Sequence, residues 1–185
     1  PEDDEFPEIK PNYVTAEQIA AGWKPFDRDE DTKVRYWAVP GTEGAMHRVG
    51  GLEKDYNTSV ISTDGKNHQR MVDARREKIA RIAEDIPLNE PKGDLSADTI
   101  LVGWGGTYGH LLTAVEELNA AGHPIALAQF RYINPLPKNA IPMLSRYKNI
   151  IVAELNTGMF ADYLQQKLPG KVIKRINKVE GQPFL

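Results

Sequence analysis

The sequence contains no cysteine, and this single absence excludes several classes of site. Without thiols the chain has no disulfide and no thiolate nucleophile. It also cannot ligate an iron–sulfur cluster through thiolates, the usual ligands of protein-bound clusters. The absence of cysteine is compatible with a reducing cytoplasm, which is the compartment we expect.

Long apolar runs and a strong excess of one charge are missing as well. No apolar stretch approaches the roughly 20 residues that a membrane-spanning helix needs. The formal net charge is only −3, and no basic stripe with interleaved aromatic residues is present. We therefore expect neither a membrane nor a nucleic acid as a partner.

Recognisable catalytic motifs are absent too. The sequence has no Walker loop, no nucleophile elbow and no paired-carboxylate motif. It has four histidines, and none of them pairs with another at a spacing typical of metal ligands. They are His47, His68, His110 and His123. We therefore expect no catalytic residue and no metal site in this chain.

What is present is an α/β pattern centred on residues 99–109. An unbroken apolar run at 100–102 leads into four glycines, and a helical period of 3.6 residues follows to about residue 121. The glycines are Gly103, Gly105, Gly106 and Gly109. This order predicts a buried strand, a tight turn and a helix that is capped near Thr107.

The alternation continues to the end of the chain. Further strands are expected at 124–130, 149–154 and 172–176, and helices at 139–148 and 159–168. Strands joined by helices run parallel through right-handed crossovers. The sequence therefore predicts an α/β domain over residues 93–185, a three-layer Rossmann-like fold with a mostly parallel sheet.

The first half of the chain has a different character. Residues 1–65 are rich in Pro, Asp and Glu, which predicts an irregular arm with one short helix at 15–22 and a strand at 34–39. Residues 66–92 read as a linker helix and linker, capped by Asp64 or Asn67 and stopped by Pro87. The helix should carry an apolar edge, formed by Val72, Ile79, Ile82, Ala83 and Ile86. The polar stretch 89–98 is the favoured domain boundary.

Two places on the α/β domain are candidate sites. Glycines between a strand and a helix can cradle a phosphate, which makes four residues of the turn candidates for cofactor binding. They are Gly105, Gly106, Thr107 and His110. However, the spacing G-x-G-G-x-x-G departs from the dinucleotide motif, and no acidic residue ends the next strand. Close packing of helix on strand is the favoured interpretation of the turn.

The second place is the sequence E-L-N-T-G at 154–158, where a strand passes into a helix. Asn156 or Thr157 should cap that helix. Ligands and partners of open α/β sheets meet this carboxyl edge. We therefore take Glu154, Asn156 and Gly158 as interface candidates, and we expect the Glu154 side chain to have no local structural role.

The order of motifs along the chain resembles the alpha subunits of 2-oxoacid:ferredoxin oxidoreductases. Similar segments are P-G-T-E-G at 40–44, R-V-G-G-L-E-K-D at 48–55, and N-H-Q-R-M-V at 67–72, followed by Arg75 and Lys78. The likeness continues through V-G-W-G-G-T at 102–107, P-L-P at 135–137, E-L-N-T-G at 154–158 and the closing N-K-V-x-G-Q-P-F. Members that use 2-oxoglutarate are the most similar. Met159 departs from the pattern, since the family usually has Gln there.

The resemblance implies a C-terminal fragment of such an alpha subunit, with a scaffolding role and no complete active site. Residues 1–65 would be the tail of a pyrimidine-binding thiamine domain, and 93–185 a transketolase C-terminal-like domain. Thiamine diphosphate, Mg²⁺ and [4Fe-4S] clusters would serve the complete enzyme, with none bound to this chain. A beta subunit would carry the thiamine site and the clusters, ferredoxin and CoA would be further partners, and homodimerisation stays open.

One alternative remains beside this reading. The chain could instead be a free-standing Rossmann-like module that binds a nucleotide or another anion through residues 103–109 and Arg131.

Overall fold

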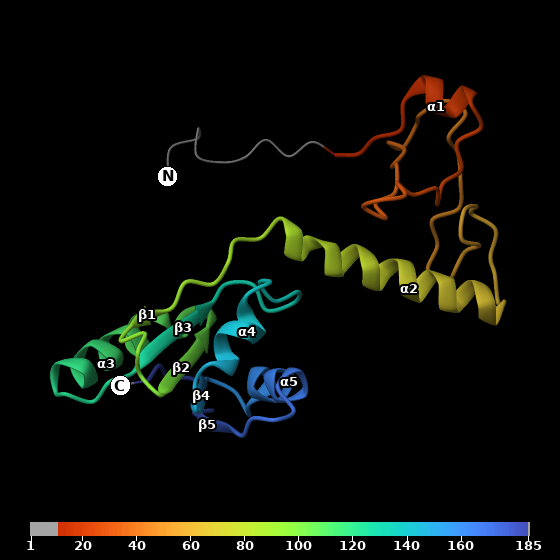
Figure 1. The fold of residues 1–185 in the computed structure, drawn as a ribbon. Coiled ribbons are helices and arrows are strands. Elements are labelled where there is room, and N and C mark those ends of the chain that lie inside the picture. Colours follow the sequence, from red (N-terminus) through yellow and green to blue (C-terminus); the bar gives the residue numbers. More distant parts are fainter. Residues whose placement is uncertain (1–10, 185) are drawn as a thin grey trace. The chain divides into compact units, whose positions relative to one another are not determined.

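The computed structural model describes residues 11–184, and the chain divides into two compact units after Arg81 (Figure 1). The division precedes the polar stretch 89–98, which the sequence favours as a boundary. No helix among the described residues is long and apolar enough to cross a membrane.

The first unit is largely irregular. Its short helix α1 (Ala16–Ala20) begins with a capping box, in which Thr15 and Gln18 exchange side-chain to backbone hydrogen bonds. The strand expected at 34–39 is not formed. Arg35 and Trp37 each make only an isolated bridge, to Arg28 and Tyr13 respectively, so no ladder builds up.

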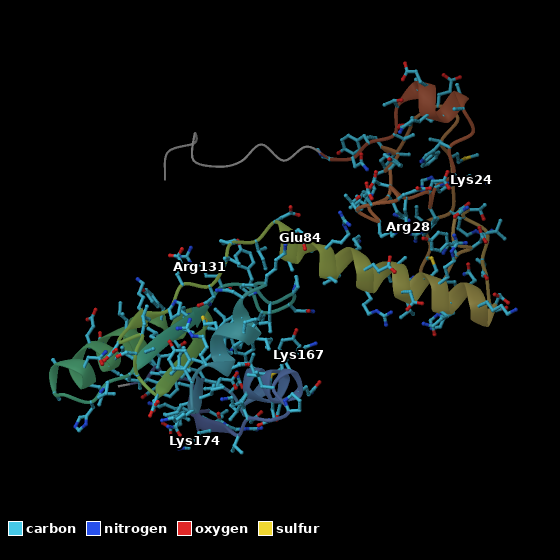
Figure 2. All side chains as sticks on the ribbon, viewed as in Figure 1. Lys24, Arg28, Glu84, Arg131, Lys167 and Lys174 are labelled. Atoms are coloured by element: carbon cyan, nitrogen blue, oxygen red, sulfur yellow. The ribbon has the colours of Figure 1, made fainter. Side chains whose placement is uncertain are left out.

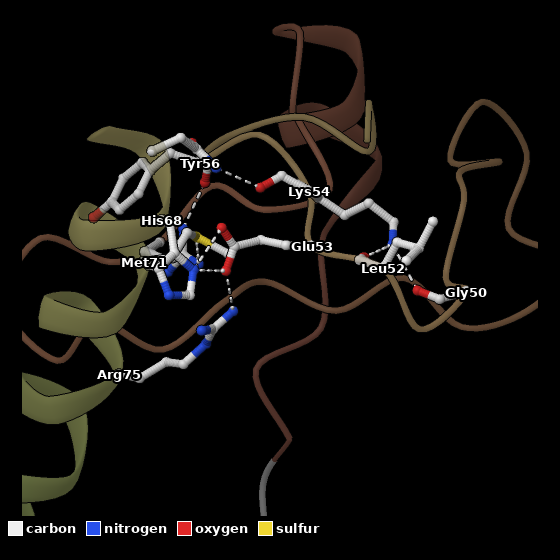
Figure 3. Close-up of polar contacts among 10 residues, drawn as sticks. Gly50, Leu52, Glu53, Lys54, Tyr56, His68, Met71 and Arg75 are labelled. Carbon is white, nitrogen blue, oxygen red and sulfur yellow. Dashed lines mark hydrogen bonds and ion pairs between the residues drawn. The ribbon is translucent and has the colours of Figure 1, made fainter. Parts of the chain in front are cut away.

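The loops of this unit are stabilised by hydrogen bonds from side chains to the backbone, since few helix or strand hydrogen bonds are present there. Oδ1 of Asp29 accepts the backbone N–H groups of residues 31 and 32, and Oδ1 of Asp55 accepts those of residues 57 and 58. These bonds hold the pKa of both carboxyls below the usual value. Lys54 is buried, and its ammonium donates to the carbonyl oxygens of Gly50 and Leu52 (Figure 3).

The long helix α2 (Gly65–Arg81) closes the first unit. Asp64 Oδ1 accepts the N–H of Asn67, so the expected cap by Asp64 is confirmed. The expected apolar edge is wrong, because the helix buries Met71 and Ala74 instead. Three members of that edge are instead exposed, Val72, Ile79 and Ile82, at 38%, 39% and 41%.

The second unit is a five-stranded sheet in the order β1-β3-β2-β4-β5. Its parallel strands are β2 (Thr99–Trp104), β3 (Ala126–Phe130), β4 (Asn149–Glu154) and β5 (Ile173–Asn177). The short edge strand β1 (Lys92–Gly93) pairs antiparallel with β3. It lies inside the stretch 89–98, which the sequence predicts to be a linker. A lysine followed by a glycine does not form a pattern that predicts a strand.

Helices cover both faces of this sheet (Figure 1). One face carries α3 (Tyr108–Ala120), whose Leu111 and Val115 pack on Leu101 and Leu127. The other carries α4 (Ala140–Ser145) and α5 (Met159–Lys167), over a larger apolar cluster. Burying each such side chain contributes about 1.5–3 kcal/mol. The predicted three-layer α/β fold with a mostly parallel sheet is confirmed.

Gly103 allows α3 to lie close against β2. A Cβ built on Gly103 would come within 2.3 Å of Leu111 Cδ1 and within 2.8 Å of both Gln129 Oε1 and Thr107 Oγ1. Real Cβ atoms do not approach other atoms this closely. The glycine therefore serves helix–strand packing, as the favoured interpretation of the turn requires.

Replacing Gly103 with Ala should lower the free energy of unfolding by about 1–3 kcal/mol, because the core around Leu111 becomes overpacked. Gly109→Ala is the matched control, since its Cβ would meet open space within α3 and Ala favours a helix. Urea unfolding of both variants measures the difference. Equal stabilities for the two variants would show that α3 does not depend on Gly103.

Candidate functional site

The glycine turn lies at the carboxyl edge of the sheet, between β2 and α3. Residues Gly105–Thr107 form a short 3₁₀ turn, in which Gly105 and Gly106 are exposed and Gly105 has φ of +58°. Thr107 is buried and donates its hydroxyl hydrogen to the carbonyl of Trp104 at 2.9 Å. Thr107 is the N-cap residue of α3 as expected, but its side chain makes no cap bond, because its hydroxyl bonds back to the strand.

A cleft of about 910 Å³ opens beside this turn, between the loop that precedes β1 and the loop that follows β3. Gly105 and Arg131 line it, and Figure 2 labels Arg131 on the second of these loops. Gly106, Thr107 and His110 are not among its lining residues, so only one of the four cofactor-binding candidates faces this cleft.

Polar side chains that sequence reasoning missed also line the cleft. Lys92 Nζ donates to the hydroxyl of Tyr108 at 2.5 Å, and its ammonium lies 5.2 Å from the centre of that ring. Asn89 donates through Nδ2 to the carbonyl of Gln129. Lys92 begins β1 and Asn89 precedes it. Both lie in the polar stretch 89–98, which gave no functional signal in the sequence.

The second candidate, at the carboxyl end of β4, is built around a buried carboxylate. Glu154 has 0% exposure, and its Oε1 accepts the indole N–H of Trp104 at 3.0 Å and the backbone N–H of Phe160 at 2.7 Å. Its Oε2 lies 3.5 Å from the backbone N of Ala161. The carboxylate therefore satisfies first-turn N–H groups of α5, where the helix dipole also favours a negative charge.

This geometry corrects two expectations about Glu154. A side chain with no exposure cannot contact a partner, so Glu154 is not available as an interface residue. It also has a local role, since it joins the end of β2 to the start of α5. The sequence places this Glu at a strand end but does not reveal the distant Trp104 that covers it.

Asn156 accepts hydrogen bonds at the start of α5 as expected, but the N-cap position is Gly158, which has no side-chain cap bond. Asn156 Oδ1 accepts the backbone N–H groups of Gly158 at 2.7 Å and of Met159 at 3.0 Å. Gly158 is buried with φ of +103°, and a Cβ there would lie 3.1 Å from Arg175 Nη1. Asn156 and Gly158 therefore have structural roles as well. Their use as interface residues stays a proposal.

The described residues do not fit two of the cofactors that the resemblance implies, the [4Fe-4S] cluster and Mg²⁺. The chain has no Cys to ligate a [4Fe-4S] cluster. Within residues 11–184, no group of three or more His, Cys, Asp or Glu side chains lies close enough to hold a metal ion. No chemical step through thiamine diphosphate, Mg²⁺ or a cluster is therefore assigned to this chain.

Removing the Glu154 carboxylate should strongly destabilise the second unit. Glu154→Ala leaves the Trp104 and Phe160 donors without a partner, which should cost about 2–4 kcal/mol. Glu154→Gln should cost less, because an amide oxygen can still accept both bonds. Asp162→Ala, an exposed carboxylate in the same helix, is the control. A loss of under 0.5 kcal/mol for Glu154→Ala in urea unfolding would contradict this role.

Comparisons with known proteins connect this geometry to one family. Residues 97–184 match the family model "Pyruvate:ferredoxin oxidoreductase core domain II". The chain is 38% identical over 164 residues to 2-oxoglutarate oxidoreductase subunit KorA of Mycobacterium tuberculosis, covering 88% of this chain and 25% of the relative. It is 27% identical over 174 residues to the 2-oxoacid:ferredoxin oxidoreductase subunit alpha of Saccharolobus solfataricus, covering 85% and 27%.

A solved structure shows the same fold. The 2-oxoglutarate:ferredoxin oxidoreductase of Magnetococcus marinus, solved with 2-oxoglutarate, coenzyme A and succinyl-CoA bound, superposes with a TM-score of 0.85 at 24% identity. The match covers 100% of this chain and 32% of that one. The chain thus spans about a quarter of the length of these curated relatives. It belongs to the alpha-subunit family of the 2-oxoacid:ferredoxin oxidoreductases, of which residues 97–184 are core domain II.

Proposed function

We propose that this chain acts as a portion of the alpha subunit of a thiamine-diphosphate-dependent 2-oxoacid:ferredoxin oxidoreductase. The observation that carries the proposal is the 38% identity to a 2-oxoglutarate oxidoreductase subunit along 88% of the chain. That span is longer than core domain II, so the irregular first unit shares in it. In the complete enzyme a 2-oxoacid would be oxidatively decarboxylated, with electrons passing to ferredoxin and the acyl group to CoA.

The proposed 2-oxoacid is 2-oxoglutarate. The name of the Mycobacterium tuberculosis relative specifies 2-oxoglutarate, and the Magnetococcus marinus enzyme has 2-oxoglutarate, coenzyme A and succinyl-CoA bound. Both support 2-oxoglutarate over pyruvate as the substrate of the complete enzyme.

Within that enzyme, the proposed role of this chain is scaffolding and assembly. In this proposal the clusters and the thiamine site belong to other parts of the complex, which is compatible with a chain that contains no cysteine. A beta subunit would hold them, and the assembled enzyme would work in the cytoplasm with ferredoxin and CoA. The buried Glu154 corner supports a structural role, since its polar groups are engaged within the fold.

A second candidate function is a nucleotide- or anion-binding module. The cleft beside the glycine turn supports it, because Gly105 and Arg131 both line that cleft. Against it, Gly103 serves helix packing, and the turn lacks the dinucleotide spacing. Binding of a nucleotide by the chain alone, lost on Arg131→Ala, would favour the module.

Activity should appear only with the complete enzyme. The chain alone, supplied with thiamine diphosphate, Mg²⁺, 2-oxoglutarate, CoA and a dye acceptor, should give no turnover. The complex purified from native cells through a tag on the protein that carries this chain should reduce the dye with 2-oxoglutarate and CoA, and more slowly with pyruvate. Turnover by the chain alone, or a tagged complex inactive with every 2-oxoacid tested, would contradict the proposal.

A further inference from the structure

A cleft of about 310 Å³ in the first unit is lined by five cationic side chains. Arg28, Lys33 and Arg35 come from the loop that follows α1, and Arg75 and Lys78 come from α2. No Asp or Glu is among the residues that line this cleft. We call it the cationic cleft. It is separate from the carboxyl edge of the sheet, which belongs to the second unit.

Arg28 lines the cationic cleft, and hydrogen bonds hold its guanidinium in place. Its Nη1 donates to the carbonyls of Phe26 at 2.8 Å and Tyr56 at 2.6 Å, and its Nη2 lies 3.2 Å from Met71 Sδ. Figure 2 labels Arg28. Burial lowers the pKa of Arg28, and the charge of Arg35 lowers it further. These bonds place the guanidinium but leave its charge unbalanced by a carboxylate.

Arg35 is half-buried, and its guanidinium lies near two aromatic rings. Its guanidinium lies over the ring of Phe26 at 4.3 Å and 5.8 Å from the centre of the Trp37 ring. Among residues 11–184 it makes no side-chain hydrogen bond and no ion pair. A guanidinium has five N–H donors in a planar fork, and partial burial of such a group without an acceptor is unfavourable. Burial accordingly lowers the pKa of Arg35.

The nearest carboxylates balance only part of this charge. Glu77 lies 3.9 Å from the ammonium of Lys33, and Glu53 lies 3.5 Å from Arg75 while it also contacts His68 at 3.0 Å (Figure 3). Among the described residues, only these two carboxylates lie within ion-pair distance of the five cations. Lys78, exposed on α2, has no carboxylate within ion-pair distance in the described part of the chain.

We propose that the cationic cleft binds a phosphate-bearing ligand, with the phosphate oxygens seated against Arg35 and Lys78. Arg guanidinium forks match phosphate oxygens in geometry and charge. Trp37 is 59% exposed at the same cleft and offers a face on which a planar ring can stack. A nucleoside diphosphate combines both groups, whereas inorganic pyrophosphate offers the phosphates alone. The proposal does not depend on which 2-oxoacid the complete enzyme uses.

Calorimetric titration of the full chain with ADP, pyrophosphate and adenosine tests this site. We expect binding of ADP, binding of pyrophosphate that is equal or weaker, and none of adenosine. Raising the salt from 20 to about 200 mM should weaken the binding markedly. Stronger binding of ADP than of pyrophosphate would indicate that the adenine ring stacks on Trp37. Equal binding would indicate that the cleft recognises the phosphates alone. No binding of either phosphate at millimolar concentration would overturn the proposal.

Variants locate the site. Arg35→Gln should weaken ADP binding at least tenfold, and Lys78→Gln several-fold. The control Lys66→Gln makes the same charge change at an exposed position of α2 outside the cationic cleft. It should leave the affinity for ADP within twofold of the wild-type value. Because Lys78 is exposed, its variant should keep the wild-type melting temperature, so it tests binding even where Arg35→Gln unfolds the unit. Unchanged affinity in Lys78→Gln together with Arg35→Lys, which lacks the fork, would overturn the assignment.

Discussion

The structure of the second unit depends on one buried carboxylate, that of Glu154. Burying a charge without partners is strongly unfavourable, so a Glu at 0% exposure requires donors on all sides. The Trp104 indole and the first-turn N–H groups of α5 supply them. The two donors come from segments that lie far apart in the sequence. This one side chain therefore holds the end of β2, the end of β4 and the start of α5 in a single arrangement.

That arrangement determines what the carboxyl edge of the sheet can do. In open α/β sheets this edge is where ligands bind. Here the β4–α5 corner is occupied by its own hydrogen bonds, and a cleft opens beside Gly105. The proposed scaffolding role rests on this corner, whose polar groups are engaged within the fold.

The sequence predicts the sheet well, because unbroken apolar runs such as 100–102 and 150–153 have few alternatives to a buried parallel strand. It fails where tertiary contacts decide. Lys92 and Gly93 form a strand only because β3 offers a free edge. The run 34–39 alternates but finds no neighbouring strand to pair with. On α2 the burial of Met71 and Ala74 depends on irregular loops, whose positions no periodicity encodes.

In the candidate site, too, contacts between residues close in sequence are predictable and contacts between distant residues are not. The hydrogen bonds of Asn156 are local in sequence and could be predicted, whereas the role of Glu154 depends on Trp104 and could not. A double-mutant cycle of Trp104→Phe and Glu154→Ala measures that dependence most directly. If the carboxylate joins strand to helix as described, the two losses of stability are less than additive by about 1–2 kcal/mol. Additive losses would show that the indole and the carboxylate act independently, and would contradict the central place given to Glu154.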